Sequence, residues 1–108
     1  VGNIFNAPIL SGTNGKIFID VLEKKILHNL DKFKPEIILL SSGFDAHKRD
    51  PLAHITLESH DYYKLTKKIV EIANIHCNGK IISFLEGGYD LEALYESIKE
   101  HFLGLAEN

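Results

Sequence analysis

The stretch KIISFLEGGYDLEAL, residues 80–94, changes its character twice within a short distance. The apolar run from Lys80 to Leu85 is typical of a buried strand, and it ends abruptly at Glu86. Two glycines and a tyrosine follow, and from Leu91 onward apolar residues recur at helical spacing. The stretch therefore predicts a strand, a tight loop and a helix, in that order.

The same alternation extends toward the start of the chain. Apolar residues at helical spacing predict one helix over 16–33, which Pro35 closes, and another over 59–76. Between them, EIILLSS at 36–42 is a continuous apolar run, as expected of a strand that is covered on both faces. The short apolar segment GNIFNAPIL, residues 2–10, is expected to form a first strand.

This order of elements predicts an α/β fold, because strands that alternate with helices form a parallel sheet with right-handed crossovers. We expect a three-layer αβα arrangement with about three strand–helix units, in which helices cover the faces of the sheet. No repeat, low-complexity segment or internal linker interrupts the pattern, so residues 1–108 are treated as one domain.

Composition narrows the class of protein. Of the 108 residues, 44% are hydrophobic and 25% are charged, which favours a folded domain over a disordered chain. The formal net charge of −3 contains no block of like charges, so nothing indicates a nucleic-acid or membrane surface. The single cysteine, Cys77, excludes an internal disulfide. Because methionine is absent and residue 1 is valine, we expect a processed product or a piece of a longer protein.

Two unusual loops, 43–56 and 86–90, each leave the carboxyl end of a predicted strand. In parallel sheets ligands bind at that edge, so we expect the loops to lie side by side there. Asp45 and Tyr89 project from them. A carboxylate in such a place can bind a metal or act as a base, and a phenol can donate a hydrogen bond to an oxygen that gains negative charge.

Structural explanations for the same residues stay open. Asp45 could cap the turn that follows it, and the Tyr89 ring could pack on the next helix. Gly87 and Gly88 leave room for a ligand to approach the backbone, but paired glycines also serve turns and phosphate loops.

The other polar residues of the first loop carry weaker signals. Asp50 and Pro51 predict a turn. His47, His54 and His60 lie in or near this loop, but their spacing fits no compact ligand pattern, so we expect solvated histidines.

Two separated motifs carry a resemblance to a known family. SSGFDAHKRDPLAHITL, residues 41–57, and LEGGYDLEAL, residues 85–94, resemble the carboxyl-terminal part of the histone deacetylase superfamily. The nearest branch is the class II and bacterial one, with the acetoin-utilisation and acetylpolyamine amidohydrolase enzymes. NAPILSGT at 6–13 and the strand after Pro35 fit the same family. The resemblance implies the αβα fold of arginases and deacetylases, of which this chain would be about the last third.

The resemblance implies a role for each matching residue. Asp45 matches one of three protein ligands to a catalytic zinc ion, and Tyr89 matches the tyrosine whose hydroxyl stabilises the oxyanion. Gly87 and Gly88 match the backbone against which the acyl group lies. Leu52 matches a residue that lines the acyl-lysine channel; a carboxylate there marks polyamine-selective relatives, and this chain has leucine.

The implied activity is zinc-dependent hydrolysis of the acetyl amide of acetyl-lysine or an acetylated amine, by a longer catalytic domain. The implied substrates are acetylated proteins, peptides or polyamines, with no direct nucleic-acid or membrane partner. The family's other two zinc ligands and its histidine pair are expected upstream, in the remainder of the domain, so we expect the isolated chain to be inactive. A cytoplasmic location is expected, or a nuclear one in a eukaryote. The alternative is a non-catalytic remnant, or a small α/β module that binds a ligand or assembles with another chain.

Overall fold

The computed structural model describes residues 2–107. Helices and two strands alternate along it, in the order α1 (Gly15–Leu22), a π-helical turn (Glu23–Leu27), α2 (His28–Phe33), β1 (Ile38–Ser42), α3 (Ser59–His76), β2 (Ile81–Leu85) and α4 (Leu91–Ala106). The strands pair in parallel, with Ile38 opposite Ile81 and Ser42 opposite Leu85. The predicted α/β class with a parallel sheet is therefore confirmed.

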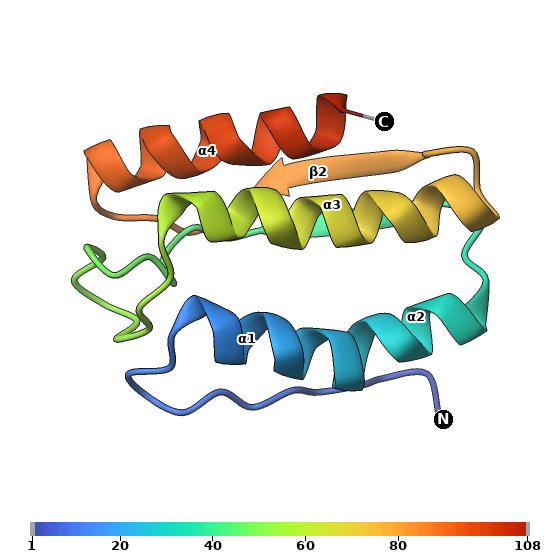
Figure 1. Ribbon diagram of the computed structural model, residues 1–108, viewed down its shortest axis with the longest axis horizontal. Coiled ribbons are helices and arrows are strands. Elements are labelled where there is room, and N and C mark those ends of the chain that lie inside the picture. The colour runs from blue at the N-terminus through green and yellow to red at the C-terminus, as the bar shows by residue number, and fades with distance from the viewer. Residues whose placement is uncertain (1, 108) are drawn as a thin grey trace.

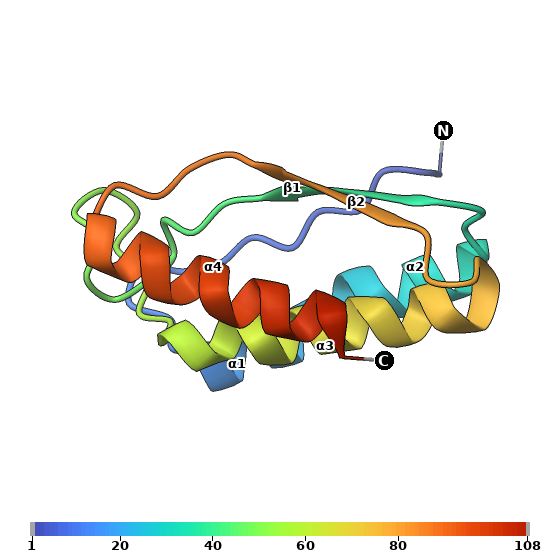
Figure 2. The same ribbon diagram turned by 90° about the horizontal axis from the view of Figure 1, so that it is seen from above.

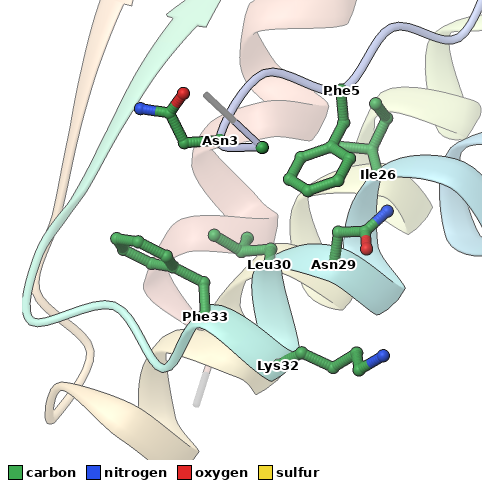
Figure 3. A pocket seen from close by; sticks show the side chains of 8 residues that line it. Asn3, Phe5, Ile26, Asn29, Leu30, Lys32 and Phe33 are labelled. Carbon is green, nitrogen blue, oxygen red and sulfur yellow. The ribbon is translucent and has the colours of Figure 1, made fainter.

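The helix predicted over 16–33 forms as one rod, in which the π-helical turn joins α1 to α2 (Figure 1). Asn14 begins it, because its side-chain oxygen accepts a hydrogen bond from the Ile17 N–H at 3.0 Å. Lys34 ends it in the left-handed conformation (φ 56°), directly before Pro35. Residues 2–5 run beside the end of this rod, where Phe5 and Phe33 line an open pocket of about 560 Å³ (Figure 3).

Local sequence also sets the ends of α3 and α4. Glu58 and Asp61 form a reciprocal capping box at the start of α3, in which the Glu58 N–H donates to Asp61 Oδ2 at 2.8 Å. Asn78 and Gly79 both have positive φ angles (55° and 73°) and turn the chain from α3 into β2. Asp90 caps α4 by accepting a hydrogen bond from the Ala93 N–H at 2.9 Å.

The helices lie together on one side of the sheet (Figure 2). Ile38 points from β1 into a core cluster beneath them, whose other buried members come from the first helical rod and from α3: Leu27, Ile72, Ala73 and Cys77. A second cluster lies nearer the loops and consists of Phe44, Leu57, Tyr62 and Leu65. Among residues 2–107, no helix combines the length and the hydrophobicity needed to cross a lipid bilayer.

The first predicted strand does not form, so the sheet has two strands where we expected three. Residues 2–10 form no regular secondary structure and are followed by a turn at Ser11 and Gly12, which is hydrogen-bonded to the loop after β1 and not to the sheet: Gly12 N–H donates to His54 O at 2.7 Å. Ile4 and Leu10 consequently remain 80% and 83% exposed. Apolar content alone did not distinguish this segment from a true strand.

Of the three expected layers, the described residues form two. Side chains alternate across a strand, so Leu39, Ile82 and Phe84 lie on the face that points away from the helices. They are 64%, 47% and 51% exposed. The continuous apolar runs of β1 and β2 therefore supply one face that is covered within residues 2–107 and one that is not.

Candidate functional site

The β1–α3 loop (residues 43–58) and the β2–α4 loop (residues 86–90) meet at the carboxyl end of the sheet. Backbone hydrogen bonds join them: Phe44 N–H donates to Gly87 O at 2.8 Å, and Glu86 N–H donates to Ser42 O at 3.0 Å. Parallel neighbouring strands end at the same edge, and the pairing simply continues past the last strand residue. The predicted juxtaposition of the two loops is confirmed.

The Asp45 carboxylate lies against the backbone of both loops. A Cβ atom on Gly87 would be 3.1 Å from Asp45 Cγ, and one on Gly43 would be 3.2 Å from Asp45 Oδ1. Any side chain at either position would push against the carboxylate, which gives both glycines a structural reason. Within residues 2–107 the Asp45 carboxylate accepts no hydrogen bond, which a carboxylate that caps a turn would do. Its oxygens therefore have capacity for a cation, and its role as a metal ligand stays a prediction.

Tyr89 follows the two glycines and is 57% exposed, so its ring is not buried against α4. Gly88 before it has a φ angle of 137°, and a Cβ atom there would lie 2.7 Å from Leu94 Cδ1. Position 88 therefore requires glycine both for its backbone angle and for the packing of α4. The two glycines have different neighbours, since Gly87 lies against Asp45 and Gly88 against Leu94.

Asp50 is the site residue that sequence reasoning missed. Its side chain is buried, Oδ1 accepts a hydrogen bond from the Leu52 N–H, and Oδ2 accepts one from the Tyr89 N–H, both at 2.9 Å. Leu52 itself is 61% exposed. The Asp-Pro pair indicated a turn, and the bond to Leu52 is such a local turn contact. The bond to Tyr89 was not visible, because it joins two loops that are far apart in the sequence.

His47 is not the solvated residue that we predicted, since only 1% of it is exposed. Its Nδ1 accepts a hydrogen bond from the Arg49 N–H at 3.1 Å, which assigns the ring proton to Nε2, 2.9 Å from Ser59 Oγ. The loop folds back on itself through the Lys48 N–H bond to Leu57 O, and that reversal buries the ring. Burial, and the nearby Arg49 charge, lower the pKa of His47. His54 and His60 are exposed, as expected.

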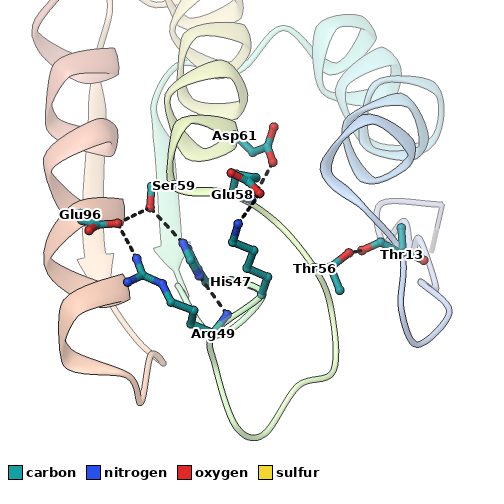
Figure 4. A network of polar contacts seen from close by, with 9 residues as sticks. Thr13, His47, Arg49, Thr56, Glu58, Ser59, Asp61 and Glu96 are labelled. Atoms are coloured by element: carbon teal, nitrogen blue, oxygen red, sulfur yellow. Dashed lines mark hydrogen bonds and ion pairs between the residues drawn. The ribbon is translucent and has the colours of Figure 1, made fainter.

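Ionic contacts attach the outer part of the β1–α3 loop to the helices (Figure 4). Arg49 pairs with Glu96 and Glu92 on α4, and Lys48 pairs with Glu58 at 2.6 Å. Ser59 Oγ donates to Glu96 Oε2 at 3.0 Å, and this bond, followed by the contact with Arg49, lowers the pKa of Glu96. These side chains are largely exposed, so they orient the loop more than they stabilise the fold.

A buried polar network lies beneath the loops, where the strands end. Ser42 Oγ and Ser83 Oγ are 2.6 Å apart, and Ser83 Oγ lies 2.8 Å from His101 Nε2. On the other side of the ring, His101 Nδ1 lies 2.7 Å from Thr66 Oγ1, which itself donates to Tyr62 O at 2.6 Å. His101 therefore joins both strands to α3 and α4, and burial lowers its pKa. Its place on the apolar face of α4, among Leu94, Ile98 and Leu105, was the available sequence signal.

These residues alone do not fit a zinc centre. Catalytic zinc is held by three protein ligands and keeps one open position. No three His, Cys, Asp or Glu side chains are grouped as metal ligands in the described part of the chain, residues 2–107. The Asp45 carboxylate is the candidate ligand at the loop edge, and further ligands would have to come from other residues.

Comparison with known proteins gives consistent results. The family described as Histone deacetylase domain matches residues 1–105. The chain is 39% identical to Type-2 histone deacetylase 2 of Dictyostelium discoideum, over 99% of this chain and 6% of that protein. It is 40% identical to Histone deacetylase 14, chloroplastic, of Arabidopsis thaliana, over 96% of this chain and 25% of that protein.

The fold agrees with these matches. The crystal structure of the HDA15 HD domain superposes with a TM-score of 0.84 and 29% sequence identity, over 94% of this chain and 28% of that one. The deacetylase-like fold and the resemblance drawn from the two motifs are thus confirmed. The chain spans 6% and 25% of the lengths of the two curated relatives, and so corresponds to one part of each.

Proposed function

The chain belongs to the histone deacetylase family, and on that premise we propose that it forms the carboxyl-terminal part of a zinc-dependent deacetylase active site. The reaction would be hydrolysis of the acetyl amide of acetyl-lysine or of another acetylated amine. The observation that supports this proposal is the meeting of two loops at the sheet edge, with the Asp45 carboxylate against Gly87 and Tyr89 exposed beside them.

Asp45 would be one zinc ligand, and the remainder of the catalytic domain would supply the others. The partly exposed carboxylate has free oxygens, and glycines at 43 and 87 leave space around it. A zinc ion bound there would supply Lewis acidity for the acetyl carbonyl and for a water molecule.

Tyr89 would donate a hydrogen bond from its hydroxyl to the acetyl carbonyl oxygen, which gains negative charge during hydrolysis. Such a donor acts mostly on the transition state, because the charge is largest there. Gly87 and Gly88 would let the acyl group lie against the backbone. Leu52, exposed and apolar, would line the channel for the aliphatic part of the substrate.

The substrate would be an acetylated protein, peptide or polyamine, and leucine at position 52 favours acetyl-lysine among these. The required partner is the remainder of the catalytic domain. A cytoplasmic location, or a nuclear one in a eukaryote, fits the proposed substrates.

The role of Tyr89 is tested by Tyr89→Phe in the complete protein that carries this chain. Loss of one oxyanion donor is expected to lower kcat on an acetyl-lysine peptide by about a hundredfold to a thousandfold, with a much smaller change in KM. Tyr95→Phe is the matched control, because Tyr95 is a 69% exposed phenol on α4 to which no role is assigned. Full turnover by Tyr89→Phe would contradict the proposal.

The metal is tested by the zinc content of the same protein. Asp45→Ala is expected to lose both bound zinc and activity, whereas Asp20→Ala, an exposed carboxylate on α1, is expected to keep both. The 108-residue chain alone is expected to bind zinc weakly and to be inactive. If Asp45→Ala retained its zinc, Asp45 would not be a ligand, and the non-catalytic alternative would gain support.

A further inference from the structure

We propose that Asp50 is a positioning residue, whose carboxylate fixes the proposed oxyanion donor Tyr89 and the proposed channel residue Leu52 relative to each other. This inference rests on the proposed function and adds a residue to it.

The two carboxylate oxygens of Asp50 are used separately. Oδ1 accepts from the Leu52 N–H within its own loop, and Oδ2 accepts from the Tyr89 N–H of the β2–α4 loop, each at 2.9 Å. Two bonds on two oxygens fix both the position and the rotation of the carboxylate plane. One side chain therefore sets the relation between the backbones of Leu52 and Tyr89.

Because Asp50 is buried, its carboxylate and the two N–H groups that it binds depend on each other. Asp50 is only 8% exposed, and a buried carboxylate is costly unless hydrogen bonds replace its water. Bonds from N–H groups to an ionised carboxylate are roughly twice as strong as neutral ones. The neighbouring Arg49 side chain pairs with Glu92 and Glu96 on α4 and not with Asp50. Within residues 2–107, the partners of the Asp50 carboxylate are therefore the N–H groups of Leu52 and Tyr89.

The β2–α4 loop needs such a contact at Tyr89. Before this residue, the loop is bonded to the β1–α3 loop through Gly87 O, and after it Asp90 begins α4 by capping it. Between these points lies Gly88, whose backbone has more conformational freedom than that of any other residue type. The bond to Asp50 holds the Tyr89 backbone in this interval.

Asp50 is expected to affect placement more than folding. Other contacts already hold the loops: the Phe44 and Glu86 backbone bonds near the strands, and the His47–Ser59 bond near α3. The Tyr89 bond lies beyond them, at the tip where the proposed catalytic group projects. A displacement of about 1 Å at a reacting group can cost about a hundredfold in rate.

The test is Asp50→Asn in the complete protein, combined with Tyr89→Phe in a double-mutant cycle. Asparagine keeps the shape but offers one acceptor oxygen, so one of the two N–H groups faces an NH2 donor. We expect kcat on an acetyl-lysine peptide to fall about tenfold to a hundredfold, with a smaller change in KM. In the Tyr89→Phe background the same substitution should have little further effect, because the hydroxyl that it positions is absent.

Asp90→Asn is the matched control. It makes the same chemical change on the neighbouring loop, but asparagine still accepts the Ala93 N–H bond as a helix cap, so kcat should stay within about twofold. A general effect of losing a loop carboxylate would lower activity in both variants.

The possible outcomes separate the positioning role of Asp50 from the proposed role of Tyr89. An equal loss of kcat from Asp50→Asn with and without the Tyr89 hydroxyl would overturn the positioning role and leave the function of Tyr89 intact. Full activity of Tyr89→Phe would instead remove the proposed function. If Asp50→Asn fails to fold, amide exchange in the unmodified protein decides: the Tyr89 and Leu52 amides should be protected, and exchange at the rate of a free loop amide would refute the contact.

Discussion

Both faces of the β1–β2 sheet are largely apolar, but only one of them is covered within residues 2–107. The face under the helices carries Ser42, the last residue of β1, and Ser83, in the middle of β2, and both are bonded into the His101 network. The face away from the helices carries Leu39 and Ile82, which are directly opposite each other in register, and both are substantially exposed. Polarity alone therefore does not say which face of a strand is covered.

The covered face accommodates its polar groups because they are paired. His101 bonds through both ring nitrogens, and Thr66 passes the chain of hydrogen bonds to a backbone carbonyl. A satisfied buried network holds its members in one arrangement, whereas an unsatisfied member would be costly. This network lies directly below the loops of the candidate site, so it supports the ends of both strands there.

The exposed face is apolar without such compensation. Within residues 2–107, Leu39, Ile82 and Phe84 form an uncovered apolar surface on a two-stranded sheet, to whose outer edges no further strand is paired. Isolated two-stranded sheets are marginal in water, and exposed apolar patches mark contact surfaces. We expect the remainder of the catalytic domain to cover this face.

The largest expected effect is on the covered face, at His101. His101→Ala removes one of the two hydrogen bonds of Ser83 Oγ and of Thr66 Oγ1 and opens a cavity, so we expect the free energy of unfolding to fall by about 3–5 kcal/mol. Urea denaturation of the chain measures this. Lys99→Ala, an exposed change on the same helix, should alter stability by less than about 0.5 kcal/mol. A loss below about 1 kcal/mol for His101→Ala would mean that the network contributes little.

A matched pair of isoleucines compares the two faces directly. Ile38 is 7% exposed in the core, and Ile82 is 47% exposed on the open face. Ile38→Thr buries a hydroxyl and removes packing, so it should cost about 2–3 kcal/mol, whereas Ile82→Thr should cost less than about 1 kcal/mol in the 108-residue chain. In the complete protein the Ile82→Thr cost should rise toward that of Ile38→Thr. Equal costs in the 108-residue chain would show that both faces are covered there.

The smallest expected effect is the dependence of stability on pH. Burial lowers the pKa of both His101 and His47 from 6.5, so below that pH the unfolded chain binds protons that the folded chain does not. The stability that these residues contribute is therefore fully present above about pH 6.5 and is lost as the pH falls from there through their folded pKa values. Urea midpoints at a series of pH values between 7.5 and 5 measure it. A midpoint that rises on acidification would contradict the assignment.

Sequence reasoning was most accurate where the signal was local. Helical spacing and the Asn78-Gly79 pair predicted α3 with its observed bounds, Ser59–His76, and the apolar run after Pro35 predicted β1. It was wrong for residues 2–10, because a short apolar segment forms a strand only if a neighbouring strand edge accepts its hydrogen bonds. Here those residues run beside α2 and the β1–α3 loop.

The candidate site shows the same difference between local signals and contacts that are distant in sequence. Asp45 and Tyr89 were singled out because the order of elements places both loops at one edge of a parallel sheet, and their roles stay predictions. The sequence analysis missed or misjudged three residues whose roles come from partners that are distant in sequence. His47 is paired with Ser59 on α3, Asp50 with Tyr89 in the β2–α4 loop, and His101 with Ser83 on β2. Residue type and spacing carry no information about such partners.

The sequence by itself determined the order of helices and strands from residue 16 onward, the edge at which the two loops leave the sheet, and the family to which the chain belongs. Each of these follows from periodicity or from short motifs, in which the informative residues are close together in the chain. Only the tertiary structure decided which strand face is covered, that the His47 ring is buried, and that the Asp50 carboxylate joins Leu52 to Tyr89. The physical reason is that burial and hydrogen-bond pairing depend on which distant segments pack together, and that packing is a property of the whole chain.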